Sequence, residues 1–276
     1  RVVALIVFCA VIGMFLATPD LPNAQVLIAG TLGIWLVAGA AAAFNCLVEQ
    51  QIDAKMARTR ARPLPRGELN SVQTLVFSSM VGGVGVWILY VFVNPLTMWL
   101  TLATFVGYAI IYTLLLKPNT PQNIVIGGAS GAMPPVLGWA AVTNSVSAEA
   151  LVLFLIIFVW TPPHFWALAI RHADEYKAAG VPMMPSVVPM KQTVRQMFIY
   201  TVLLAVTTLI LGPVANLGLT YMISAVILGL GFIASTVDLG RHPSASRAMR
   251  VFGFSITYVT VLFTAMAVDV FVKHGL

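Results

Sequence analysis

Three oxygen-bearing side chains recur at four-residue intervals near position 50: Asn45, Glu49 and Asp53. On an α-helix this spacing places them along one face, over about 12 Å of the helix axis. A cluster of cations follows at once: Lys55, Arg58, Arg60, Arg62 and Arg66. Carboxylate and amide oxygens suit Mg²⁺, and Arg and Lys neutralise phosphate oxygens. The segment 45–67 therefore indicates a site for a diphosphate held through Mg²⁺.

A structural alternative exists for the two acids. Ionised side chains at the end of a membrane helix are costly unless they are paired or lie in a wet cavity. Glu49 and Asp53 could simply pair with nearby arginines. The number of cations exceeds what two carboxylates need, and this excess favours the site for an additional anion.

A second polar segment, 161–185, contains an acidic pair of its own, Asp174 and Glu175, flanked by Arg171 and Lys177. Alone, it is typical of an ordinary charged loop after an apolar span. Together with the first cluster, it predicts the other half of one site. In the same segment His164 follows two prolines, and it either packs through a hydrogen bond to a neighbouring helix or contacts substrate.

A third polar connection lies between these two, at 117–123. Lys117 is a candidate phosphate contact and Asn123 a candidate lining residue for a cavity. The glycines and prolines that follow permit close helix approach, which is a structural explanation for them.

The composition identifies the environment that must position these residues. The 276-residue chain is 59% hydrophobic and 9% charged, with a net charge of +6 and a mean hydropathy of +0.94. Soluble domains contain about 25% charged residues, so we expect an integral, all-α membrane protein in contact with the lipid bilayer. In such a chain, basic residues mark cytoplasmic loops, and a nucleic-acid partner is not expected.

Nine apolar spans are predicted, at 2–17, 24–46, 71–92, 95–116, 123–142, 148–170, 196–213, 218–237 and 251–272. Alternate connections are short and lack Lys and Arg, whereas the others are basic. With the N-terminus inside, every Lys and Arg except Lys273 lies on the cytoplasmic side, so the positive-inside rule predicts an N-in/C-out topology. We expect one domain over 1–276, with a weak pseudo-repeat of 1–116 and 117–237 followed by the last helix.

The motifs of this chain resemble those of a known family. Residues 45–67 read N-x-x-x-E-x-x-x-D-x-x-M-x-R-T-x-x-R-P-L-P-x-G, followed by T-P-Q-N-I-V-I-G-G at 120–128, T-P-P-H-F-W-A-L-A at 161–169 and A-G-V-P-M-M-P at 179–185. The first pattern resembles the first signature of the UbiA-type intramembrane prenyltransferases. The full set is similar to the branch that farnesylates heme. The resemblance runs from the first span to the last.

This resemblance implies nine helices around a central cavity in a bacterial-type inner membrane, with the mouth of the active site on the cytoplasmic side. It implies Mg²⁺-dependent transfer of farnesyl from farnesyl diphosphate to a vinyl group of heme B, with water addition, to give heme O and diphosphate. Heme B is then a substrate rather than a cofactor. A heme A synthase or an oxidase assembly factor is the expected recipient of the product.

The resemblance, together with the chemistry of the residues themselves, assigns roles to residues. The expected catalytic and metal-binding residues are Asn45, Glu49, Asp53 and Asp174, with Glu175 as a further metal ligand. The expected diphosphate contacts are Arg58, Arg62, Lys117, Arg171 and Lys177. The expected heme or prenyl contacts are His164, Asn123, Trp166 and Tyr112, whose aromatic members could stabilise an allylic cation. Many relatives have a carboxylate four positions before Asp174, where this chain has Ile170.

Two other functions compete with this one. A related prenyltransferase could use an aromatic quinone precursor as acceptor. A transporter is less consistent with the sequence, because transporters place ionisable groups near the membrane midplane and need access from both sides.

Overall fold

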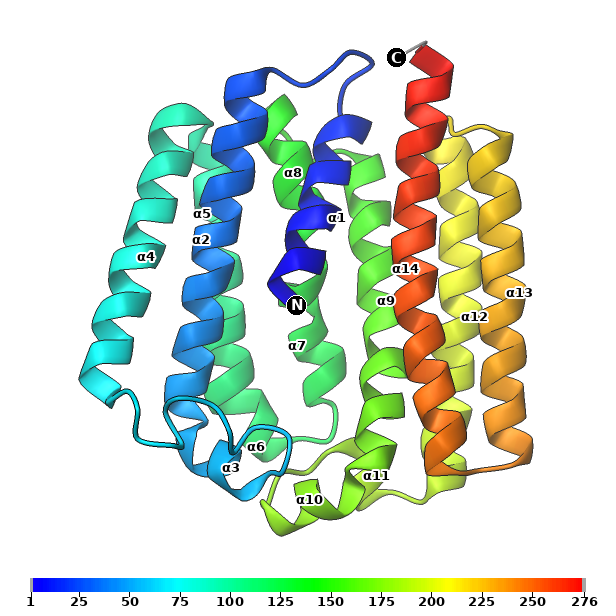
Figure 1. The fold of residues 1–276 in the computed structure, drawn as a ribbon. Coiled ribbons are helices and arrows are strands. Elements are labelled where there is room, and N and C mark those ends of the chain that lie inside the picture. Colours follow the sequence, from blue (N-terminus) through cyan, green and yellow to red (C-terminus); the bar gives the residue numbers. More distant parts are fainter. Residues whose placement is uncertain (1, 275–276) are drawn as a thin grey trace.

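The computed structural model describes residues 2–274, and that range contains helices and connections without β-strands (Figure 1). The helices in chain order are α1 (Val2–Leu16), α2 (Ala24–Val48), α3 (Gln50–Lys55), α4 (Ser71–Phe92), α5 (Pro95–Val106), the π-helix η1 (Gly107–Leu116), α6 (Lys117–Asn119), α7 (Asn123–Ala132), α8 (Pro134–Thr143), α9 (Ala148–Arg171), α10 (Ala173–Ala178), α11 (Met184–Val187), α12 (Met190–Val214), α13 (Leu219–Arg241) and α14 (Ala245–His274). The predicted all-α class is confirmed.

Eight helical segments of the described range are long and apolar enough to cross a membrane, and the shorter apolar helix Val3–Leu16 precedes them. The protein is therefore a multi-pass membrane protein. The eight segments correspond to the second to ninth predicted spans. The count of nine spans, the central cavity and the N-in/C-out orientation stay predictions.

Asparagine caps start several of these helices, because the side-chain oxygen accepts a hydrogen bond from an otherwise unpaired N–H of the first turn. Asn23 Oδ1 accepts from the backbone N of Gln25 at 2.8 Å before α2. Asn70 forms a reciprocal capping box with Gln73 before α4. Asn94 caps α5, which has Pro95 at its first position.

Three predicted spans differ most from the helices observed, and one of them, 196–213, corresponds to α12, which already starts at Met190. The segment 123–142 is divided into α7 and α8 at Met133, since Pro134 has no N–H to continue the hydrogen-bond ladder. The last helix begins at Ala245 rather than at 251, because α14 extends past its apolar part. In that extension Arg247 and Arg250 both pair with Asp238 of α13.

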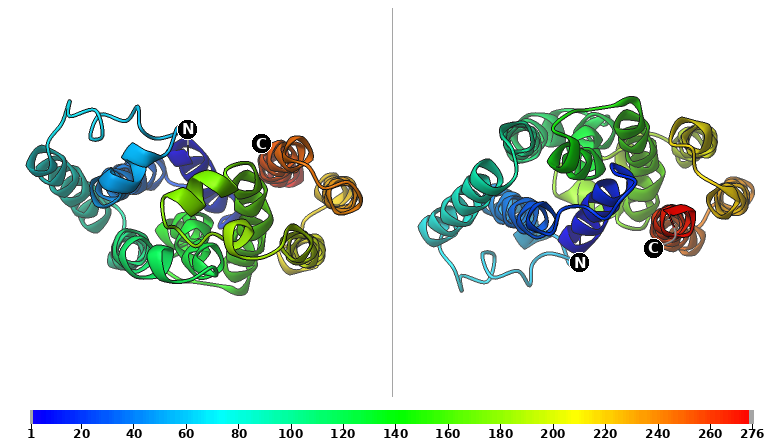
Figure 2. Two further views of the ribbon diagram at one scale, coloured as in Figure 1. Left: turned by 90° about the horizontal axis from the view of Figure 1, so that it is seen from below. Right: turned by 90° about the horizontal axis from the view of Figure 1, so that it is seen from above.

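Neighbouring helices in the sequence pack side by side around the bundle, as both axial views show (Figure 2). Helix α1 packs against α2, α8 and α14. It therefore links the N-terminal helices to the C-terminal helix. Its contact with α8 is backbone to backbone. A β-carbon at Gly138 would lie 1.9 Å from the carbonyl oxygen of Ala10, and one at Gly13 would lie 2.3 Å from that of Pro135. Glycine is required at both positions for this approach.

The long connections all lie at one end of the bundle, where α3, α6, α10 and α11 are found (Figure 1). The short connections between α1 and α2, α4 and α5, α8 and α9, and α12 and α13 lie at the other end. The basic connections thus share one face of the protein. Helix α4 exposes Phe77, Met80 and Trp87 along its outer side, as expected of a surface that contacts lipid.

Candidate active site

The first acidic motif lies where α2 ends and α3 begins. Glu49 stands at the joint with φ −90° and ψ 8°, outside regular helical geometry. The hydrogen-bond ladder nevertheless continues, because Glu49 N donates to Asn45 O at 3.0 Å and Asp53 N to Glu49 O at 2.8 Å. The three side chains therefore follow one another along one face. All three are buried, with exposed fractions of 7%, 5% and 2% in chain order.

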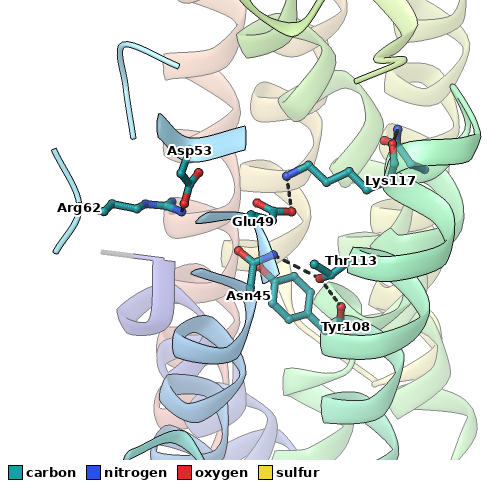
Figure 3. Close-up of polar contacts among 8 residues, drawn as sticks. Asn45, Glu49, Asp53, Arg62, Tyr108, Thr113 and Lys117 are labelled. Carbon is teal, nitrogen blue, oxygen red and sulfur yellow. Dashed lines mark hydrogen bonds and ion pairs between the residues drawn. The ribbon is translucent and has the colours of Figure 1, made fainter. Parts of the chain in front are cut away.

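Each of the two acids is paired with a cation from another segment (Figure 3). Lys117, at the start of α6, brings Nζ to 2.5 Å from Oε1 of Glu49. Arg62, in the connection after α3, brings Nη1 to 2.5 Å from Oδ2 of Asp53. An uncompensated buried charge is costly, so these pairs allow the carboxylates to be ionised beneath the surface. The structure thus brings together five of the residues predicted from the sequence.

Asn45 is held by a residue that the sequence analysis did not identify. Its Nδ2 donates to Thr113 Oγ1 at 3.2 Å, and that hydroxyl donates to the backbone oxygen of Tyr108 at 2.8 Å (Figure 3). Because the one hydroxyl proton is used on Tyr108, Thr113 must act as acceptor toward Asn45. The amide is thereby oriented with Nδ2 toward Thr113, which leaves Oδ1 on its other side.

The position of Thr113 depends on the conformation of its helix and not on a sequence motif. It lies within η1, and π-helical segments shift side chains by one position relative to an α-helix. No spacing in the sequence indicates this shift. The same segment contains Tyr112, which is half-buried, stacks on Tyr108 with ring centroids 5.6 Å apart and lies against Gly127. Tyr112 is thus next to the Asn45 contact.

The donor set of this cluster fits a magnesium ion. Within residues 2–274, no hydrogen bond reaches Asn45 Oδ1, Glu49 Oε2 or Asp53 Oδ1. Three oxygens, one amide and two carboxylate, are thus free on one face of α2 and α3. Mg²⁺ favours such oxygens and takes the rest of its ligands from water and phosphate. Asn45, Glu49 and Asp53 are the residues that would hold it.

Helix α10 contacts the loop after α3 through Glu175, which the sequence analysis predicts as a metal ligand. Glu175 Oε2 accepts from the backbone N of Ala57 at 3.0 Å, and its Oε1 lies 2.9 Å from Nδ1 of His172. The hydrogen bond from His172 is the main reason that the pKa of Glu175 lies below its ordinary value. Glu175 therefore joins α10 to the loop after α3, and its predicted metal role stays a prediction.

Tyr176 follows Glu175 on α10 and lies next to Arg58 of the loop after α3. Tyr176 is buried, and burial raises the pKa of its phenol, while the adjacent Arg58 acts in the opposite direction. The charge of Glu49 also raises this pKa. Three further predicted residues, Asp174, Arg171 and Lys177, are exposed on α10 and the end of α9. Their roles as metal or diphosphate contacts stay predictions.

His164 lies in the interface between α9 and α14. Its Nδ1 is 2.6 Å from Oγ of Ser255, whose proton goes to the backbone oxygen of Phe252 at 2.6 Å. Nδ1 is therefore the donor, and Nε2 carries the lone pair. The imidazole also stacks between Trp160, at 4.2 Å, and Phe252, at 4.6 Å. These contacts hold the imidazole in the helix interface, and the predicted contact of His164 with a substrate stays a prediction.

The two remaining predicted contacts are both buried. Asn123 donates to the backbone oxygen of Thr120 at 2.7 Å and so fixes the connection before α7, while its Oδ1 has no hydrogen-bond partner among the described residues. Trp166 is fully buried and meets Tyr200 of α12 edge to face. Neither residue is joined to the acidic cluster by a hydrogen bond within residues 2–274.

Comparison with known proteins identifies a family and a fold. The profile of the UbiA prenyltransferase family matches residues 6–263. A protoheme IX farnesyltransferase of Azoarcus sp. (strain BH72) is 60% identical over 274 residues, which cover 99% of this chain and 92% of that protein. Among solved structures, digeranylgeranylglyceryl phosphate synthase superposes with a TM-score of 0.81 at 17% identity, covering 96% of this chain and 92% of that one. A UbiA homolog from Archaeoglobus fulgidus, bound to GPP and Mg²⁺, superposes with a TM-score of 0.63 at 14% identity over 96% of both chains.

Proposed function

The chain belongs to the UbiA prenyltransferase family, and we propose that it transfers the farnesyl group of farnesyl diphosphate to a vinyl group of heme B, with addition of water, to give heme O and diphosphate. The observation that carries this proposal is the buried cluster of Asn45, Glu49 and Asp53, with Lys117 and Arg62 bound to its two acids. The protoheme IX farnesyltransferase with 60% identity supports the choice of substrates.

The first chemical step breaks the bond between C1 of the farnesyl group and the diphosphate oxygen. A bound magnesium ion would supply positive charge that stabilises the departing diphosphate. Asn45, Glu49 and Asp53 are the residues that would hold it through their free oxygens. Arg62 and Lys117 move from the carboxylates to the phosphate oxygens, where they neutralise the developing charge in a site already ordered for it. Arg58, next to Tyr176, is a further diphosphate contact.

The second step joins the two substrates. The terminal vinyl carbon of heme B bonds to C1 of the farnesyl group, and the carbon left cationic takes up water and loses a proton. The allylic cation must be kept from water until then. Tyr112 and Tyr108, stacked beside Asn45, present aromatic faces that stabilise such a cation. His164 is the proposed heme contact, through the lone pair on Nε2.

We further infer where the reaction occurs. The end of the bundle with the long basic connections faces the cytoplasm, since Lys and Arg are retained on that side. The active-site mouth then opens on the cytoplasmic side of a bacterial inner membrane. Heme O leaves the protein within the bilayer, so a heme A synthase or an oxidase assembly factor in the same membrane is the proposed recipient.

The test is a product assay. Purified protein in detergent with Mg²⁺, farnesyl diphosphate and heme B is expected to form heme O, identified by chromatography and mass, and EDTA is expected to abolish the product. Asp53→Asn should lose turnover, whereas Asp20→Asn, which changes an exposed acid in the connection before α2, should not. Prenylation of an aromatic acid in place of heme would overturn the assignment of the acceptor.

A further inference from the structure

A groove with two cations lies between α12 and α13, apart from the acidic cluster. Its volume is about 440 Å³, within the range of roughly 300–1,000 Å³ typical of small-molecule sites. The residues that line it are Lys191, Val194, Arg195, Phe198, Thr236, Val237, Gly240 and Pro243. Both helices lie at the outside of the bundle in the axial views (Figure 2). The groove therefore opens at the surface that lipid covers.

The groove divides into a charged end and an apolar wall. Lys191 and Arg195 are one turn apart on α12 and so lie on the same face of that helix. Both are exposed, and neither forms an ion pair with any acid among residues 2–274. The nearest acid of α13 in sequence, Asp238, is engaged by Arg247 and Arg250. Two uncompensated positive charges thus remain at the groove.

The depth of the groove depends on the glycine at position 240, which has no side chain. Gly240 is on α13, one turn after Thr236, and a β-carbon there would lie 3.6 Å from Val194 Cγ1, at ordinary contact distance. A larger side chain at this position would occupy the space that is open. Phe198, 38% exposed, extends the apolar wall from the charged end toward the middle of α12.

We propose that this groove binds an anionic phospholipid, with the headgroup phosphate on Lys191 and Arg195 and the acyl chains along Val194 and Phe198. The charges are complementary to a phosphodiester, and the groove lies at the end of the bundle that carries the basic connections. Basic pockets between membrane helices at this level suit anionic headgroups. Arginine and lysine both bond phosphate oxygens, and the apolar wall matches a lipid better than a free phosphate.

The experiment measures lipid binding without the transfer reaction. Dioleoylphosphatidylglycerol is titrated into the full chain in detergent, and the shift in melting temperature and the bound lipid seen by native mass spectrometry are recorded. Dioleoylphosphatidylcholine and inorganic phosphate are the comparison ligands. We expect phosphatidylglycerol alone to stabilise the protein and remain bound, because a ligand that binds only the folded state raises its melting temperature.

Two variants separate charge from shape. Lys191→Gln/Arg195→Gln is expected to weaken phosphatidylglycerol binding by about 30-fold, since each cation contributes a factor of about five near an anionic headgroup. Gly240→Leu is expected to block binding without any change in charge. The matched control, Arg60→Gln/Arg241→Gln, removes two exposed cations outside the groove and should bind as the wild type does.

Three results would overturn the proposal: equal stabilisation by phosphatidylcholine, equal binding by the groove variants and the control, or stabilisation by inorganic phosphate alone. The groove variants should also retain the wild-type KM for farnesyl diphosphate. A raised KM would show that the groove serves the prenyl substrate instead of a lipid.

Discussion

The hydroxyl of Thr113 provides the sharpest test of how the site is organised. Thr113→Val keeps the shape of the side chain but removes the acceptor that orients Asn45 at 3.2 Å. Both residues are buried, so the Asn45 Nδ2 group is left without its partner, at a cost of about 1–3 kcal/mol. The amide is then free to rotate and to present nitrogen where oxygen is needed.

The expected consequence is weaker binding of the magnesium diphosphate. A loss of 1–2 kcal/mol in orientation corresponds to about a 5- to 30-fold rise in the Mg²⁺ concentration that gives half-maximal rate and in the KM for farnesyl diphosphate. The assay is heme O formation at varied Mg²⁺ and farnesyl diphosphate. The rate at saturation should change less than either of these two constants.

Two further variants make the result interpretable. Thr113→Ser retains the hydroxyl and should behave as the wild type. Thr101→Val removes a buried hydroxyl on α5 that has no hydrogen-bond partner among residues 2–274, and it should leave both constants unchanged. The reasoning is refuted if Thr113→Val has wild-type constants, or if Thr113→Ser is as impaired as Thr113→Val.

Three other predictions concern stability and the loop. Lys117→Met leaves the buried Glu49 carboxylate unpaired and should lower the free energy of unfolding by about 3–5 kcal/mol, which thermal unfolding in detergent would register; adding Glu49→Gln should restore most of it, and an unchanged melting temperature would contradict the buried pair. Gly138→Ala forces a β-carbon against the backbone of α1 and should destabilise by at least about 1–3 kcal/mol, whereas Gly131→Ala, with open space around it, should not. Glu175→Ala removes the acceptor that joins α10 to the loop after α3, so trypsin should cut at the arginines of that loop faster than in the wild type; equal rates would mean that this contact does not hold the loop.

Much of the fold follows from the period and length of the apolar segments. Eight spans are where the hydropathy predicts them, because each must cross the same thickness of lipid. The ends are less predictable. Helix α14 starts six residues earlier than expected, since Arg247 and Arg250 both pair with Asp238 near the end of α13, and hydropathy does not register such ion pairs.

The candidate site also contains residues that the sequence predicts and residues that it does not. Asn45, Glu49 and Asp53 are readable because helical spacing alone places them on one face. Lys117 could be named only as a phosphate contact, since its pairing with Glu49 spans 68 residues. Thr113 left no signal at all, because its place depends on a π-helical segment that no residue pattern marks. Glu175 is predicted from the sequence as a metal ligand, whereas its two carboxylate oxygens contact Ala57 N and His172 Nδ1 in the structure.

The pairing of the two acids with Lys117 and Arg62 has a thermodynamic consequence. Magnesium alone would add two positive charges to acids that Lys117 and Arg62 already neutralise, while diphosphate alone would draw these cations away and leave two buried carboxylates unpaired. Only the two together preserve the balance of charge. Metal and diphosphate are therefore expected to bind with positive cooperativity, each raising the affinity of the other by the same factor. Without the prenyl donor, the site should remain largely closed to the free metal.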